Sequence, residues 1–285
     1  MNHVKEKFIR DNPHRKDEAN DFLKDYAHAY ISGIDINPDL AKVAKMHMIL
    51  YDDGHSGIFA ANSLENFDNL VRIAQTMGVP RAIQPQPDTF QVLMTNPPFG
   101  TKGKVTNKRI LENFDLGHKW RKEDDRWIKP SKLLDGQVPD ILFIERCLQL
   151  LENHGRMAIV LPDGDLTNQS AEYIREFIKQ KARLLAVVSL PPEAFIPHGT
   201  GVKASVLFLQ KLSEEELEEF KKQDYSIFMA ICEKIGYDVR GRALYKKDEK
   251  GELIRDENGE EIIDSDIPEI IEGFGDFKRK YNFEF

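Results

Sequence analysis

Between residues 30 and 211, short apolar runs alternate with longer segments in which apolar residues recur every three or four positions. The first pattern is typical of buried strands and the second of helices packed on one side. The helix predicted after Val138 begins at Pro139 and closes at Gly155, and the next one has Asn168 or Ser170 as its cap. Helices are thus predicted at 38–51, 139–155 and 168–182, and strands at 30–36, 57–61, 90–95, 156–162, 183–191 and 203–211.

The predicted strands are continuous apolar runs, which is typical of strands that are buried on both faces. Their alternation with helices predicts an α/β fold with a largely parallel sheet. The strands at 183–191 and 203–211 are joined without a helical segment, so we expect a terminal antiparallel hairpin there. In such sheets, ligands bind beyond the carboxyl ends of the strands.

Three regions are expected along the chain. Residues 1–30 form a polar, helical leader or linker, residues 31–212 hold the alternating pattern, and residues 213–285 form an acidic extension. Within the extension, the pattern predicts a charged helix, a strand, a polar hairpin and a closing helix. These fall at 213–223, 225–232, 244–262 and 265–281.

Composition excludes several classes of protein. The 285 residues are 41% hydrophobic and 31% charged, as in a soluble globular protein, and no run approaches the roughly 20 apolar residues of a membrane-spanning helix. Cys147 and Cys232 are too few for a disulfide framework or a four-cysteine zinc site, so no metal is expected. A reducing cytoplasm fits this cysteine usage.

The net charge of −8 is unevenly distributed. Residues 213–285 hold 12 basic and 21 acidic side chains, whereas residues 100–132 hold ten basic and five acidic ones. A positive segment in an acidic protein is compatible with a nucleic-acid partner. On charge alone, a solvated loop is favoured over a binding surface.

The strand at 90–95 ends abruptly in Asn96, Pro97, Pro98 and Phe99. The two prolines fix two φ angles and remove two backbone N–H donors, so the turn presents carbonyls and the Asn96 amide without competing donors. An amide oxygen and a carbonyl accept the hydrogens of a planar –NH₂ group, while an aromatic ring stacks on its heterocycle. Such acceptors favour a tetrahedral nitrogen and free its lone pair for attack, without a strong base.

NPPF at the end of a strand resembles the catalytic motif of amino-methyltransferases that act on adenine in DNA. Residues 31–285 are similar to the modification subunit of type I restriction-modification systems. The similar stretches are GIDINPDLAKVAKMHMILYDDG, ANSL, FQVLMTNPPFG, GRMAIVLPDGDL, FIPHGTGVKASVLFLQK, GYDVRGRALYKKDEKG and DIPEIIEGF. The resemblance implies a Rossmann-like methyltransferase sheet, with residues 31–212 as a partial catalytic domain and a small α+β extension. It also implies methyl transfer from S-adenosylmethionine to N6 of an adenine flipped out of the duplex.

The resemblance implies a role for each residue of Asn96–Phe99, which form a sharp corner at the end of the strand and are called the NPPF corner below. Asn96 and the Pro97 carbonyl match the acceptors of the target amine, Pro98 belongs to the same motif, and Phe99 matches the stacking ring. Asn96 also borders the cofactor. The loop HGTGVK at 198–203 resembles a family loop near the target base. Contacts to substrate DNA are expected from Lys102, Lys104, Lys108, Arg109, Phe195, Thr200 and Lys203.

The cofactor residues implied by the resemblance lie at two other strand ends. Asp35 matches the acid that binds the ribose hydroxyls, and Ile36 would lie against the cofactor's adenine. Asn62, followed by Ser63, matches the residue that reads the edge of that adenine.

Each of these residues also has a simpler explanation. Asp35 suits a helix N-terminus, Asn62 suits a turn, and Asn-Pro-Pro suits any turn. NPPF directly after an apolar strand, with Asp35 and Asn62 at successive strand ends, outweighs those explanations. G-x-x-G-K at 100–104 is not a phosphate-binding loop, because its spacing is wrong and no helical pattern follows.

The family's cofactor site begins with a glycine-rich turn after a first strand, and residues 1–30 contain no glycine. GTG at 199–201 and GFG at 273–275 lack the strand-to-helix setting. We therefore expect an N-terminal truncation relative to the family, with a gap in the sheet between the strands at 30–36 and 90–95. S-adenosylmethionine should then bind weakly or not at all unless a complementing N-terminal polypeptide supplies the strand.

Two other functions stay open. The chain could be a catalytically silent fragment or subunit-binding piece, or it could methylate an amine of an RNA base or a protein glutamine. The basic segment and the extent of the resemblance favour DNA. The resemblance further implies double-stranded DNA, a specificity subunit and a restriction subunit as partners.

Overall fold

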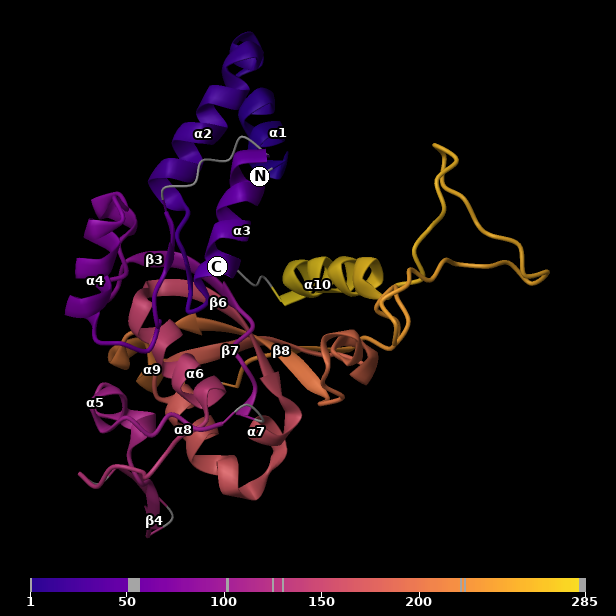
Figure 1. Ribbon diagram of the computed structural model, residues 1–285. Helices are drawn as coiled ribbons and strands as arrows, with labels where there is room; N and C mark the ends of the chain where they lie inside the picture. Colours follow the sequence, from indigo (N-terminus) through magenta and orange to yellow (C-terminus); the bar gives the residue numbers. More distant parts are fainter. Residues whose placement is uncertain are drawn as a thin grey trace.

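The computed structural model describes residues 2–50, 57–100, 103–124, 126–129, 131–220, 222 and 224–281. Its strands form a small parallel sheet, a larger sheet of five strands and an outlying hairpin (Figure 1). This arrangement confirms the predicted α/β class. The small sheet pairs β1 (Gly33–Asp35) with β2 (Ile58–Ala60). The larger sheet has the order β3 (Phe90–Thr95), β6 (Leu151–Pro162), β8 (Ala204–Lys211), β7 (Ala182–Ser189) and β9 (Phe228–Ile231).

The predicted antiparallel hairpin is confirmed, but it is not terminal. β8 runs antiparallel to both β6 and β7, while β9 adds a further strand parallel to β7. The gap between the first and third predicted strands is also present, because β1 and β3 belong to different sheets. Among the described strands, each of the two pairs on one edge only.

The prediction of a helix over 139–155 is wrong at its end. α6 (Pro139–Leu150) stops at Leu150, and β6 begins at the next residue. The N–H of Thr89 donates to the Leu150 carbonyl at 2.9 Å, and Phe90 pairs with Leu151. The helix therefore ends at Leu150 because the chain pairs with β3 from that point on. Gly155 lies in the irregular start of β6, where an added Cβ would stand 3.0 Å from the Phe90 carbonyl oxygen.

The predicted cap of the next helix is wrong as well. α8 (Glu172–Lys179) is entered through a 3₁₀ turn at Gln169–Ala171, and neither Asn168 nor Ser170 caps it with a side chain. The sequence pattern also missed four short elements: α4 (Phe67–Thr76), α5 (Lys108–Leu111), α7 (Asp163–Thr167) and the hairpin of β4 (Arg121–Glu123) with β5 (Arg126–Ile128).

The main core lies between one face of the larger sheet and the helices α6 and α8. Ile144, Ile159 and Leu209 are fully enclosed there, and each such side chain stabilises the fold by about 1.5–3 kcal/mol. A second cluster joins β2 to α4, and a third joins the segment after β2 to α5 and α6. α6 therefore contacts both the sheet and the loops beyond it.

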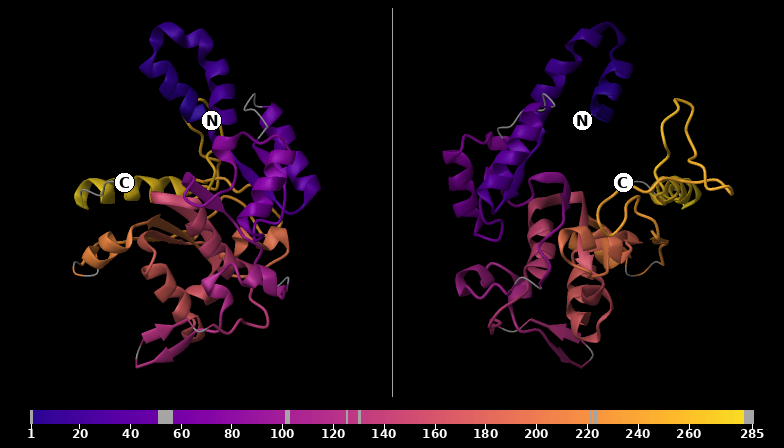
Figure 2. Two further views of the ribbon diagram at one scale, coloured as in Figure 1. Left: turned by 90° about the vertical axis from the view of Figure 1, so that its left-hand side faces the viewer. Right: turned by 45° about the vertical axis from the view of Figure 1, so that its right-hand side comes forward.

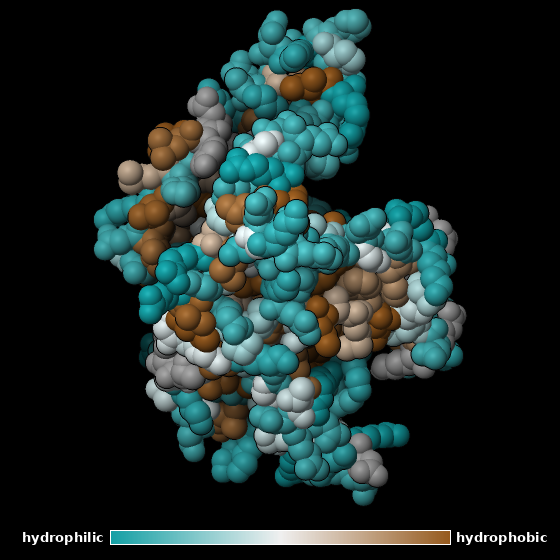
Figure 3. All heavy atoms as spheres, turned by 90° about the vertical axis from the view of Figure 1, so that its right-hand side faces the viewer, coloured by the Kyte–Doolittle hydropathy of each residue, from teal (hydrophilic) through white to brown (hydrophobic). Residues whose placement is uncertain are grey.

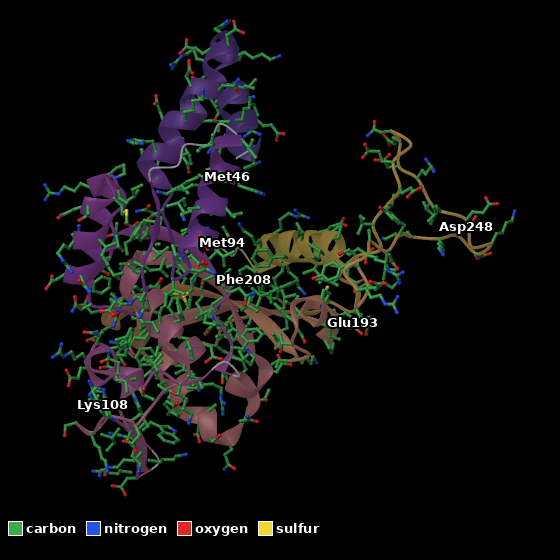
Figure 4. All side chains as sticks on the ribbon, in the orientation of Figure 1. Met46, Met94, Lys108, Glu193, Phe208 and Asp248 are labelled. Carbon is green, nitrogen blue, oxygen red and sulfur yellow. The ribbon has the colours of Figure 1, made fainter. Side chains whose placement is uncertain are left out.

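The opposite face of the larger sheet is only partly covered. Strand register places Met94, Ala158, Phe208, Ala186 and Phe228 in one row across it. α10 (Ile267–Tyr281) covers the Phe228 end, where aromatic rings of the helix pack against Phe228 at centroid distances of 5.3 and 5.6 Å. Met94, labelled with Phe208 in Figure 4, is 79% exposed at the other end.

A helix near this open face also exposes apolar side chains. α3 (Pro38–Leu50) buries Ala41 and leaves Leu40, Val43 and Met46 exposed. Apolar patches also interrupt the polar surface on the side of the molecule that faces the viewer in Figure 3. Contiguous exposed apolar surface of this kind is typical of an interaction site.

Two extensions project from this body (Figures 1 and 2). At the N-terminal side, α1 (Asn2–Asp11) and α2 (Ala19–Tyr30) form a helical pair. At the other end, α9 (Glu214–Phe220) leads to β9, and residues 235–265 form an arm of paired segments before α10. None of the helices within the described ranges is both long and apolar enough to cross a membrane.

Candidate active site

The NPPF corner directly follows β3, as the sequence predicted. Asn96 and Pro98 are exposed, whereas Pro97 is buried and Phe99 is only 8% exposed. The corner thus turns the Asn96 amide outward and directs one ring into the protein. It lies at the carboxyl end of a parallel strand pair, since Thr95 aligns with Ile159 of β6. This is the end at which α/β sheets bind ligands.

The segment between β7 and β8 packs against this corner. The Phe195 ring stands edge-on to Phe99, with the ring centroids 5.4 Å apart and the planes at 68°. The structure therefore brings together two aromatic residues that are 96 positions apart in the chain.

The other two candidate residues of this segment have local partners. The Thr200 hydroxyl accepts a hydrogen bond from the Val202 N–H at 3.4 Å. Lys203 Nζ lies 3.8 Å from Asp163 Oδ2, and the Ser205 hydroxyl donates to Oδ1 of the same carboxylate at 2.7 Å. The contacts of Asp163 with Lys203 and Ser205 hold the end of this loop against the segment that follows β6.

The cofactor candidates meet at the ends of β1 and β2. Asp35 aligns with Ala60, which places it beside Asn62 and Ser63, and the Ala61 N–H donates to the Asp35 carbonyl at 3.0 Å. Ile36 is 70% exposed next to them. The structure thus groups the four predicted residues, one pair on each strand end.

Asp35 and Asn62 also accept hydrogen bonds from nearby backbone N–H groups. Asp35 Oδ1 accepts the Asn37 N–H at 2.7 Å, and Asn62 Oδ1 accepts the Leu64 N–H at 3.1 Å. The start of α3 is capped by Asn37, whose Oδ1 accepts the Asp39 N–H at 2.9 Å, so capping does not explain Asp35. Because a carboxylate has a second oxygen, the local bond leaves Asp35 able to bind a hydroxyl.

The basic segment is more ordered than a solvated loop. Lys108 Nζ donates to the Leu134 carbonyl at 2.6 Å and lies 3.3 Å from Asp135. Lys129 pairs with Asp115 at 2.5 Å. Lys104 and Arg109 are exposed, and Lys102 lies outside the described residues. Of the lysines predicted to contact DNA here, Lys108 therefore has a structural role.

Sequence reasoning missed two acids beside the corner. Asp140, at the start of α6, accepts the Gly100 N–H at 3.1 Å, and burial raises the pKa of its carboxyl. Asp165 follows β6, and burial together with nearby Asp140 raises its pKa to about 7. An acid after a helix-starting proline, as in Pro139–Asp140, was the available signal for the first.

A separate cavity lies away from the corner. It has a volume of 520 Å³ and is lined in part by Phe67, Asp88, Arg146 and Lys211. Asp88 precedes β3, so this cavity lies at the opposite end of that strand from Asn96. Within the described residues, no cluster of three or more His, Cys, Asp or Glu is arranged to hold a metal ion.

The sequence is similar to a known family and to a curated relative. The sequence model of the N-6 DNA methylase family matches residues 5–271. A curated relative, the EcoEI type I restriction enzyme methylase subunit of Escherichia coli, is 30% identical over 125 residues, which are 44% of this chain and 21% of the relative. The chain thus spans about a fifth of that relative.

Solved structures with a similar arrangement share little sequence. A modification subunit of a putative type I restriction enzyme from Vibrio vulnificus is 18% identical, with a TM-score of 0.47 over 86% of this chain and 48% of its own. The M protein of the EcoKI type I restriction enzyme is 20% identical, with a TM-score of 0.43 over 69% and 32%. A putative class I S-adenosylmethionine-dependent methyltransferase from Listeria monocytogenes is 16% identical, with a TM-score of 0.46 over 71% and 49%.

Proposed function

The chain belongs to the N-6 DNA methylase family, and from that premise we propose that it carries the target-base site of a DNA adenine-N6 methyltransferase. The observation that carries the proposal is the corner itself. An outward amide at Asn96 and a ring at Phe99, joined by two prolines, end the strand at the ligand-binding edge of the sheet.

The chemistry proposed for the corner is nucleophilic attack by an exocyclic amine. Asn96 Oδ1 and the Pro97 carbonyl accept the two N6 hydrogens, while Phe99 and Phe195 hold the flipped adenine. With the cofactor bound, N6 would form a C–N bond to its methyl carbon as the C–S bond breaks, the thioether S-adenosylhomocysteine would leave, and N6 would lose one proton to solvent. The residues of the chain position the amine and make its lone pair available.

S-adenosylmethionine is the proposed methyl donor. The paired strand ends fit its nucleoside part, since a carboxylate at Asp35 accepts ribose hydroxyls and exposed Ile36 offers an apolar surface for the adenine. Asn62 and Ser63 supply polar groups beside that surface. Bound at the ends of β1 and β2, the cofactor would carry its electrophilic methyl group toward the target amine held by Asn96.

Methyl transfer in this proposal requires a further strand between β1 and β3. Three features support this: β1 and β3 each pair on one edge only among the described strands, Met94 is exposed, and one side of α3 exposes apolar residues. A strand with a glycine turn, placed between β1 and β3, would join the two sheets and bind the methionine part of the cofactor. Calorimetric titration of S-adenosylmethionine into the chain alone should show weak or no binding, and micromolar affinity would contradict this requirement.

The proposed nucleic-acid partner is double-stranded DNA. Lys104 and Arg109 are exposed on the segment that follows the corner, and Thr200 and Lys203 lie on the loop that carries Phe195. Basic side chains beside a site suit contacts to the phosphate backbone. A specificity subunit would select the target sequence and a restriction subunit would complete the complex, as in type I systems.

A test of the proposal identifies the product. The chain, combined with an upstream companion polypeptide and a specificity subunit, is incubated with labelled S-adenosylmethionine and either duplex DNA, RNA or protein. Digestion and mass spectrometry should find N6-methyladenine in the DNA only. Methylated glutamine or RNA would reassign the substrate, and no transfer by the assembled complex would favour the silent fragment.

A further inference from the structure

Three charged side chains of α6 are almost fully buried. Asp140, Glu145 and Arg146 are 2%, 6% and 1% exposed, respectively. Charged residues are rarely buried to this extent, because an unpaired charge in the interior is strongly unfavourable. Each must therefore have partners that compensate for the lost water.

Asp140 binds the residue that follows the corner. Its Oδ2 accepts the Gly100 N–H at 3.1 Å, while Oδ1 accepts the Ile141 N–H at 3.0 Å within the helix. Gly100 also packs closely on Val138, where an added Cβ would lie 2.6 Å from a methyl carbon. The end of the corner is thus attached to the first turn of α6.

Glu145 binds the basic segment. Its two carboxylate oxygens accept the N–H groups of Asp115 and Leu116, each at 2.8 Å. Gln149 donates to the same carboxylate at 3.2 Å. Two consecutive backbone amides bound by one carboxylate fix both the position and the direction of the segment.

Arg146 binds the loop that carries Asn62. Its Nη2 donates to the Glu65 carbonyl at 2.8 Å and lies 3.4 Å from the Leu64 carbonyl. The guanidinium stands 4.3 Å from the ring centroid of Phe67 and 4.8 Å from that of Phe114. The two rings stabilise the charge of the guanidinium, while its Nε and Nη1 are buried without a hydrogen bond to the described residues.

We propose that Asp140, Glu145 and Arg146 are positioning residues, through which α6 holds the amine site, the basic segment and the cofactor loop in one rigid frame. The assignment of these three loops rests on the proposed function. The frame itself rests on the contacts, since each charge is bound to the backbone of a different loop. Burial raises the pKa of Glu145 to about 7, against the opposing effect of the two backbone N–H groups, and lowers that of Arg146 to about 10.

Hydrogen–deuterium exchange on the full chain tests the frame. Asp140→Asn and Glu145→Gln each replace one of two accepting oxygens by an –NH₂ group, and Arg146→Met removes the donor, so each variant weakens the bonds to one loop at little change in size. Each variant should speed exchange about tenfold in the peptide that contains its own loop, at 100–105, 115–118 or 62–66, and change the other two little. Leu148→Ala, a buried apolar change on the same helix, should instead affect all three peptides alike. Equal effects of the polar variants on all three peptides would overturn the proposal.

A second measurement uses the unaltered chain, so its result does not depend on whether the variants fold. The amide resonances of Asp115 and Leu116 should shift together with a midpoint near pH 7 as Glu145 titrates, because both donate to its carboxylate. The charged groups facing this carboxylate are Asp115, Lys129 and Arg146, of which Asp115 and Lys129 form an exposed pair. If the two resonances followed no common titration at any pH at which the chain is folded, Glu145 would not hold the segment.

Steady-state kinetics of the chain in complex with its companion polypeptide and specificity subunit distinguish a failure of the frame from a failure of the proposed function. Asp140→Asn should lower kcat, Glu145→Gln should raise KM for DNA, and Arg146→Met should raise KM for S-adenosylmethionine. Local exchange effects without this division would refute the proposed roles of the loops and leave the frame in place. A uniform loss of all constants together with uniform exchange would refute the frame.

Discussion

Glu145 makes the stability of the fold depend on pH in a way that a single substitution removes. Burial is the main cause of its raised pKa, about 7 against an ordinary 4.5, and only the two backbone N–H groups and Lys129 act in the other direction. Because the folded-state pKa lies above the ordinary value, folding favours the protonated carboxyl. Its contribution to stability is complete below pH 4.5 and is lost as the pH rises through about 7.

The size of the loss follows from the two pKa values. At about 1.4 kcal/mol for each pH unit between them, the ionised carboxylate costs up to about 3 kcal/mol. About 2 kcal/mol of this falls between roughly pH 5.5 and pH 8. In Glu145→Gln the side chain stays neutral and keeps one acceptor, so it resembles the protonated acid. The free energy of unfolding of the variant, minus that of the parent, should therefore rise by about 2 kcal/mol over this range.

Urea denaturation followed by circular dichroism at the two pH values measures this difference. Asp165, whose pKa is also raised to about 7, is present in both proteins and cancels. Glu112→Gln, which removes an exposed carboxylate from the same segment, serves as the control and should leave the pH dependence unchanged. The reasoning would be refuted if the difference between parent and Glu145→Gln were the same at both pH values.

Two further predictions concern packing. Gly57→Ala should lower the free energy of unfolding by about 1–3 kcal/mol in the same denaturation assay, because a Cβ there would lie 1.9 Å from the Ile31 carbonyl oxygen; an unchanged midpoint would contradict the close approach. Phe195→Leu should cost about 1 kcal/mol by removing the ring pair with Phe99, and a double-mutant cycle with Phe99→Leu should show a coupling of similar size; additive effects would mean that the rings do not interact.

The sequence predicted the elements around the corner well. The strand before Asn96 was predicted with its observed bounds, Phe90–Thr95, because the prolines stop it. The end of α6 was missed, since the apolar run through Leu150 and Leu151 continues from helix into strand without a turn residue. Only the pairing of Phe90 with Leu151, a contact between distant segments, shows where the helix ends.

The site residues at strand ends could be predicted from the sequence. The roles of the buried charges within α6 could not. Asp35 and Asn62 follow successive parallel strands, so their proximity follows from topology. Glu145 and Arg146 look like ordinary charges on a helix, and the partners that bury them are backbone groups of loops with no sequence signal. Phe195 was predicted as a substrate contact, but its packing on Phe99 depends on the turn between β7 and β8.

The amide of Asn96 is the most direct test of the account. Asn96→Ala removes one of the two proposed acceptors of the target amine from an exposed position, so the fold should keep its melting temperature. Asn168→Ala, another exposed asparagine of the same chain, is the matched control. In the assembled complex, the rate of N6-methyladenine formation should fall by about 100-fold or more in Asn96→Ala and stay at the parent value in Asn168→Ala. A folded Asn96→Ala protein that methylates adenine at the parent rate would contradict the proposed site.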